Sequence, residues 1–152
     1  MPCCVFFGHK DADSSISSRV KEAIIKLIRE QGVNEFFVGN NGKFDYIVYS
    51  ALKEIKSEYP NITYSVALAY LLGIKPEYEN YYADEETLLP DGIEVGPARF
   101  AIDRRNKWMV EQADYVITHV THSWGGAAKF KELAEKGENR SLTLSDDIFR
   151  AD

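Results

Sequence analysis

Arg105 is the residue of this sequence best suited to holding an anion. In a helix over residues 98–113 it would follow Ile102 by three positions and precede Met109 by four, and so share their apolar, inward face. A guanidinium on such a face requires a partner, because burying an unpaired charge is costly. The partner would be either a carboxylate of this protein or an anionic group of a ligand.

Glycine-containing turns follow three of the expected strands, each just before an expected helix. They comprise Gly8-His9-Lys10, the stretch from Gly39 to Asp45 with Asn40, Asn41 and Gly42, and Gly125-Gly126-Ala127. Glycine lets a phosphate approach the main chain closely, and the N–H groups at a helix start favour anions. The stretch from Gly39 to Gly42 matches neither a Walker A loop nor a G-x-G-x-x-G fingerprint, and glycine is common in plain turns, so these glycines alone favour ordinary turns over phosphate binding.

Four polar residues near these turns each have two interpretations. His9 would either contact a phosphate or ribose or cap the chain locally, and Asp45 would either bind a ribose hydroxyl or favour the dipole of its helix. Lys10 and Arg104 are phosphate contacts or surface charges. His119 is more typical of a structural histidine than of an acid or base. No third partner completes a metal site, and we expect no metal or cofactor.

The elements that would position these residues alternate between strands and helices. Strands are predicted at 3–7, 36–38, 62–69, 114–120 and 141–144, and helices at 16–31, 44–58, 97–113 and 126–136. This order predicts an α/β fold with a mainly parallel sheet of about five strands and right-handed crossovers. Ligands of such sheets bind beyond the carboxyl ends of the strands, where the glycine turns lie.

The segment 70–97 interrupts the alternation. It contains Pro76, several tyrosines and an acidic run at 84–86, and a loop of this length in a compact domain is usually functional or mobile. We expect an irregular, lid-like segment with one helical turn near Glu77. Its tyrosines would either stack on a base or pack on the sheet edge.

Composition limits the class of protein. The chain has 152 residues, of which 45% are hydrophobic, and this predicts a single domain over 1–152. The net charge of −6 disfavours nucleic acid as a partner. Neither a signal peptide nor a membrane span is predicted, and the adjacent Cys3 and Cys4 favour buried, reduced thiols. We therefore expect a cytoplasmic protein, whose apolar helix faces would permit a homodimer.

Several motifs together resemble the SLOG superfamily. They are Gly8-His9, Gly39-x-x-Gly42-x-Phe44-Asp45, Arg105-Asn106-x-Trp108-Met109-Val110, Asp114 and Gly125-Gly126-Ala127. The chain is most similar to the small bacterial YpsA-like proteins of uncharacterised function, and more distantly to LOG-type phosphoribohydrolases and DprA/Smf proteins. The resemblance covers nearly the whole chain and implies a Rossmann-like, three-layer domain that binds a nucleotide or nucleotide-derived ligand.

The resemblance also implies roles for single residues. Arg105 matches the arginine of the hydrolases, Asn106 takes the place of their lysine, and Glu132 falls at their catalytic glutamate. Phosphate would lie on Gly125-Gly126 and Arg105, with ribose near the stretch from Gly39 to Asp45. Asn40 and Asn41 depart from the Gly-Ala of many relatives.

The turn after the fourth expected strand departs further from the hydrolase pattern. Trp124 replaces a proline, Ala128 a glycine and Lys129 a threonine, which removes close backbone approach and one hydrogen bond to phosphate. Glu132 also lies four residues before Lys136, as on a solvated helix face.

Three functions follow as expectations. The first is binding of a nucleotide-like small molecule of the nucleoside monophosphate, NAD or ADP-ribose type at the carboxyl edge of the sheet. The second is a phosphoribohydrolase that cleaves an N-glycosidic bond through Glu132 and Arg105. The third is a nucleic-acid or protein interaction module. Whether the chain is an enzyme, and which base it would bind, are left open.

Overall fold

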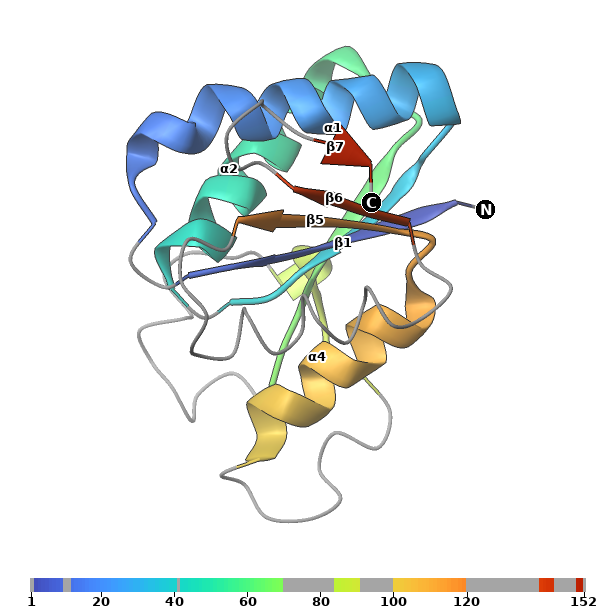
Figure 1. The fold of residues 1–152 in the computed structure, drawn as a ribbon. Helices are drawn as coiled ribbons and strands as arrows, with labels where there is room; N and C mark the ends of the chain where they lie inside the picture. Colours follow the sequence, from blue (N-terminus) through green and yellow to red (C-terminus); the bar gives the residue numbers. More distant parts are fainter. Residues whose placement is uncertain are drawn as a thin grey trace.

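A central β-sheet with helices on both faces organises the chain (Figure 1). The computed structural model describes residues 2–9, 12–40, 42–69, 84–90, 100–119, 140–143 and 150–151. The elements are β1 (Cys3–Gly8), η1 (Ser14–Ile16), α1 (Ser17–Gln31), β2 (Glu35–Val38), α2 (Lys43–Glu58), β3 (Thr63–Ala67), η2 (Asp84–Glu86), β4 (Thr87–Leu88), α4 (Ala101–Gln112), β5 (Tyr115–His119), β6 (Arg140–Thr143) and β7 (Arg150–Ala151).

The strands follow the order β4-β3-β2-β1-β5-β6-β7. Every neighbouring pair from β4 to β6 is parallel, and only the two-residue β7 is antiparallel to its neighbour among the described strands. Helices α1 and α2 lie on one face of the sheet and α4 on the other (Figure 1). The predicted α/β fold with a mainly parallel sheet is therefore confirmed, and it is a Rossmann-like, three-layer arrangement.

The central strand β1 is buried on both faces. Its alternate side chains enter two separate cores, because successive side chains of a strand point to opposite faces. Cys4 and Phe6 pack under α1 and α2, whereas Cys3, Val5 and Phe7 pack toward α4. The continuous apolar run of β1 thus fits a position with helices above and below it.

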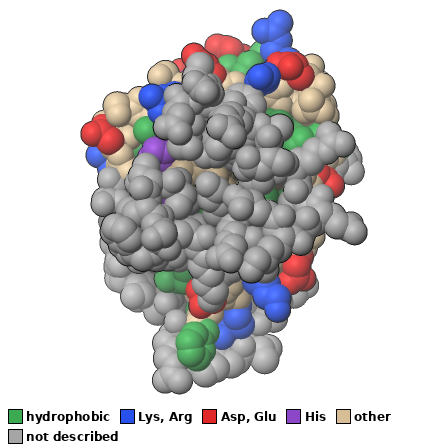
Figure 2. Space-filling view, viewed as in Figure 1, with side chains coloured by type: hydrophobic (Ala, Val, Ile, Leu, Met, Phe, Trp, Pro, Cys, Tyr) green, Lys and Arg blue, Asp and Glu red, His purple; other side chains and the backbone are tan. Residues whose placement is uncertain are grey.

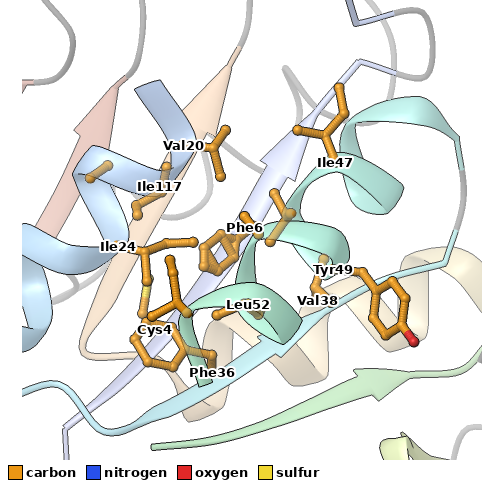
Figure 3. Close-up of a cluster of buried hydrophobic side chains, with 14 of the residues drawn as sticks. Cys4, Phe6, Val20, Ile24, Phe36, Val38, Ile47, Tyr49, Leu52 and Ile117 are labelled. Atoms are coloured by element: carbon orange, nitrogen blue, oxygen red, sulfur yellow. The ribbon is translucent and has the colours of Figure 1, made fainter. Parts of the chain in front are cut away.

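The core under α1 and α2 is the larger of the two. Figure 3 shows Val20 and Ile24 of α1 and Leu52 of α2 converging with Phe6 of β1. All six apolar positions that predicted the second helix are buried in α2: Phe44, Ile47, Val48, Ala51, Leu52 and Ile55. Helix α1 ends where the sequence predicts. Its C-cap residue, Gly32, has φ 70°, a left-handed conformation that favours glycine.

The smaller core joins α4 to the opposite face of the sheet. Met109 is fully buried there beside Val5 and Val116. Trp108 packs edge-on against Phe37 with ring centroids 5.1 Å apart, so it belongs to this core. The helical layers on both faces are therefore held to the sheet by packed apolar side chains.

Two short strands were missed by the sequence analysis. Strand β4 and the turn η2 lie within the segment expected to be irregular, and β7 lies in the expected polar tail. Glu86 of η2 accepts hydrogen bonds from Tyr49 of α2 at 2.9 Å and from Tyr64 of β3, which fastens this segment to the sheet edge. Helix α4 begins at Ala101, later than the predicted start. The helical turn expected near Glu77 and the helix expected at 126–136 lie outside the described residues.

Candidate functional site

The carboxyl ends of the parallel strands bring several of the predicted residues together. Gly8 and His9 end β1, Gly39 and Asn40 follow β2, and Asp45 lies in the first turn of α2. Arg105 reaches the same region from α4, on the other face of the sheet. The site therefore draws on both helical layers, which meet beyond the ends of the strands.

Arg105 is buried, with 2% of its surface exposed. Its Nε donates to Asn106 Oδ1 at 2.8 Å, and its Nη1 donates to Asn40 Oδ1 at 3.0 Å and to the carbonyl oxygen of Ala67 at 3.3 Å. The inward orientation predicted from helical spacing is confirmed. These three acceptors are uncharged oxygens, and they hold the guanidinium in one position beside the ends of β2 and β3.

Two charged side chains lie very close to Gly39. A Cβ atom on this residue would lie 2.8 Å from Cζ of Arg105 and 2.8 Å from Oδ2 of Asp45. The two groups are therefore close to the same point and close to each other. Asp45 is also buried, with 7% exposed, and as an acidic residue in the first turn of α2 it is favoured by the helix dipole.

Asn40 uses only part of its hydrogen-bonding capacity. Its side chain is 3% exposed, and its Nδ2 is buried without a hydrogen-bond partner in the part of the chain that the structure describes. A guanidinium has only donors, so the oxygen of the Asn40 amide must face Arg105 and the NH2 group must point elsewhere. An unsatisfied buried donor costs about 1–3 kcal/mol, so this amide has a strong preference for an added acceptor.

The start of α2 offers further donors. Its N-cap residue Gly42 has φ 103°, a conformation that favours glycine, and no side chain caps the first turn within the described residues. The first N–H groups of a helix have no partner inside the helix. The start of α2 therefore favours an electron-rich group, which could also reach the neighbouring Asn40.

A packed pair of rings closes the α1 and α2 side of the site. A Cβ on Gly8 would lie 2.2 Å from Cγ of Phe44, so this ring rests directly on the backbone at the end of β1. The imidazole of His119 stacks on Phe44 with centroids 6.1 Å apart and an interplanar angle of 16°. Gly8 and His119 are register partners in β1 and β5, which explains why one ring contacts both.

His119 is held in its neutral form. Burial lowers the pKa of the imidazole below its ordinary value, and the positive charge of Arg19 lowers it further. Its Nδ1 is buried and has no hydrogen-bond partner within the described ranges. A neutral histidine at the point where the order of the sheet reverses provides a polar atom without a charge.

The remaining predicted residues divide into two groups. Asn106 is 9% exposed and supports Arg105 from the adjacent position, Arg104 is half-buried, and His9 is buried. Lys10, Asn41, Gly125, Gly126, Ala127 and Glu132 lie outside the described residues.

Some contributors to the site were not singled out from the sequence. Phe44 was identified only as a core position of its helix and as part of a motif, and His119 was favoured as structural. The carbonyl of Ala67 carries no sequence signal, because any residue supplies one. The pair of asparagines that directly follows Gly39 was the sequence feature nearest to the crowded end of β2.

The described residues lack two kinds of feature. They contain no group of three His, Cys, Asp or Glu side chains arranged to hold a metal ion. None of the described helices is long and apolar enough to cross a membrane. On the face drawn in Figure 2, acidic and basic side chains of the described residues are interspersed.

No protein-family model matches this chain, and no curated protein matches it either. The resemblance to the SLOG superfamily therefore stays a prediction that depends on the quoted motifs.

Proposed function

We propose that this protein binds a nucleotide or nucleotide-derived ligand, of the nucleoside monophosphate, NAD or ADP-ribose type, at the carboxyl edge of its sheet. We also propose that the chain is related to SLOG-type proteins. The observation that carries it is the buried polar cluster of Gly39, Asn40, Asp45 and Arg105, located where parallel α/β sheets bind ligands.

The cluster supports ligand binding because burying polar groups is unfavourable for a purely structural purpose. Three polar side chains, Asn40, Asp45 and Arg105, are each at least nine-tenths buried around a single glycine. Apolar residues of similar volume would often be neutral or stabilising at such a position. A pre-formed cluster of convergent polar groups is typical of a small-molecule site.

The chemistry of the cluster suits a ligand with both anionic and hydroxyl groups. Arg105 and the start of α2 favour negative charge, and Asp45 accepts hydrogen bonds from hydroxyl groups. A nucleotide contains both kinds of group, one as phosphate and the other as ribose. We assign ribose to the region from Gly39 to Asp45 and phosphate to the side of Arg105 nearest β5.

Ligand-dependent thermal stabilisation tests this proposal. The melting temperature of the protein is measured with nucleoside monophosphates, NAD and ADP-ribose, and with inorganic phosphate at the same ionic strength as the control. A ligand at 100 times its Kd stabilises the folded state by about 2.7 kcal/mol. Melting temperatures that no nucleotide raises above the phosphate control would overturn the proposal.

The same samples address the hydrolase alternative. Any stabilising ligand is incubated with the protein and then separated by chromatography. Unchanged ligand supports binding alone, whereas free base and a ribose phosphate indicate cleavage of the N-glycosidic bond.

A further inference from the structure

The buried cluster contains an amide and a carboxylate that both lie next to one arginine. Asn40 contacts Arg105 through Oδ1, and a carboxylate oxygen of Asp45 lies against Gly39 at the same 2.8 Å as the carbon of the Arg105 guanidinium. All three side chains are buried. Their relative placement is therefore set by contacts within the protein, before any ligand binds.

The way in which Asn40 and Asp45 can each form hydrogen bonds is also determined. Arg105 has no acceptor, so it requires the oxygen of Asn40 and leaves the NH2 group for another partner. Asp45 in its ionised form has only acceptor positions, with room for more than one hydrogen bond. The NH2 group of Asn40 must therefore donate a hydrogen bond to any further partner, and the carboxylate of Asp45 must accept one.

We propose that Asn40 and Asp45 form a hydroxyl-binding pair that selects ribonucleotides over deoxyribonucleotides. The inference rests on the proposed nucleotide-binding function and identifies the sugar as the group that the pair reads. A sugar hydroxyl accepts from the Asn40 amide through its oxygen and donates its proton to the Asp45 carboxylate. The vicinal hydroxyl groups of ribose present two such groups side by side.

A phosphate fits the same pair less well. Its oxygens would satisfy the Asn40 amide, but an ionised phosphate has no proton to donate and its charge opposes that of Asp45. A sugar that lacks the hydroxyl would leave the buried amide without an acceptor. Sites that hydrogen-bond a hydroxyl discriminate strongly against the analogue without it, because their own buried polar groups are then unpaired.

The sequence analysis placed Asn40 among the candidate ligand-binding residues without giving its side chain a separate role. Its amide nitrogen is the buried donor that the described structure leaves unsatisfied. The N-cap of α2, Gly42, lies two residues further along the chain and has no side-chain cap within the described residues. The start of a helix favours an acceptor, which agrees with the donor that Asn40 offers.

The test compares binding of the four common ribonucleoside 5′-monophosphates with their 2′-deoxy and 3′-deoxy counterparts by isothermal titration calorimetry. We expect the best ribonucleotide to bind at least about tenfold more tightly than one of its deoxy forms. The variants are Asn40→Asp, which keeps an oxygen for Arg105 and removes the donor, and Asn40→Ala, which removes both. In both variants the ratio of ribonucleotide to deoxyribonucleotide affinity should fall toward one.

The matched control is Asn61→Asp, the same substitution at an exposed position before β3. It should leave the ratio unchanged. Thermal melting of each variant without ligand establishes that the fold is retained.

Each outcome decides the matter. Equal affinity for ribo and deoxy forms in the unsubstituted protein overturns the hydroxyl-binding pair and leaves the nucleotide proposal intact. A ratio that persists in Asn40→Ala removes Asn40 from recognition of the sugar. Absence of binding by every nucleotide of this series, together with no stabilisation by NAD or ADP-ribose in the melting experiment, overturns both proposals together.

Discussion

The two ends of the sheet use their polar groups differently. At the amino ends, polar groups join one segment of the chain to the next: Asp114 and Cys3 exchange two hydrogen bonds of 2.8 and 3.0 Å, and the backbone N–H of Thr63 donates to Asn34 at 2.8 Å. At the carboxyl ends, Arg105, Asn40 and Asp45 form a buried cluster with a donor to spare. The amino ends join segments of the chain, whereas the carboxyl ends gather buried polar side chains around Arg105.

The described residues form a hollow at the amino end of the sheet. The amino end has an open depression of about 330 Å³ between the ends of α1 and α2, lined in part by Ile28, Tyr59 and Ile62. Lys56 already donates to the carbonyls of Pro60 and Ile62 beside it. This depression therefore lies beside polar groups that already bond to one another.

Removing the charge of Arg105 should have the largest effect on stability. Arg105→Met keeps the length of the side chain but leaves the oxygens of Asn40 and Ala67 without their donor and removes the positive charge near Asp45. We expect the free energy of unfolding to fall by about 3–5 kcal/mol, measured by urea denaturation. The control is Lys107→Met on the exposed side of the same helix. A loss below that of the control would show that the cluster does not depend on the guanidinium.

Glycines at the two ends of the sheet should respond differently to alanine. Gly8→Ala places a Cβ 2.2 Å from the Phe44 ring, which must shift with the backbone of α2, so we expect a loss of about 3 kcal/mol. Gly32→Ala meets nothing within 4 Å and costs only its left-handed conformation, about 1–2 kcal/mol. Equal losses in urea denaturation would contradict the crowding assigned to the carboxyl end.

His119 should give the smallest effect, visible only as a dependence on pH. Its folded pKa is lowered by burial and by Arg19, so the folded state binds fewer protons than the unfolded state. Its contribution to stability is complete above the ordinary value of about 6.5 and is lost as the pH falls through the folded pKa.

The variant His119→Phe isolates this term. It retains a ring for stacking on Phe44 and removes the titrating nitrogen. Melting temperatures between about pH 7 and pH 5 should fall less steeply in the variant than in the unsubstituted protein. Parallel curves would show that His119 does not titrate differently on folding.

The sequence predicted the fold because the strongest signals are local. The apolar spacing in α1 and α2 and the continuous run in β1 each demand a buried face, and the alternation of strands with helices leaves few topologies. Strands β4 and β7 have two residues each, too few for a period to be recognised. Their pairing depends on the neighbouring strands β3 and β6, which only the folded sheet brings next to them.

The candidate site was predicted only in outline. Helical spacing showed that Arg105 faces inward, and the carboxyl-end rule showed which turns would surround it. The acceptors on Asn40 and Ala67 come from segments far away in the sequence, 65 and 38 residues from Arg105, and only the folded sheet brings them together. The crowding at Gly39 is likewise a property of three elements at once.

The reactivity of the two thiols of β1 reports on global unfolding of the protein. Cys3 and Cys4 are buried and unpaired, and burial, followed by the charges of Glu35 and Asp114, raises the pKa of Cys3 to about 12. Burial raises the pKa of Cys4 as well. Alkylating reagents attack thiolates, so modification must wait until β1 separates from both neighbours. The rate at which the two sulfurs react therefore measures how often the middle of this sheet opens.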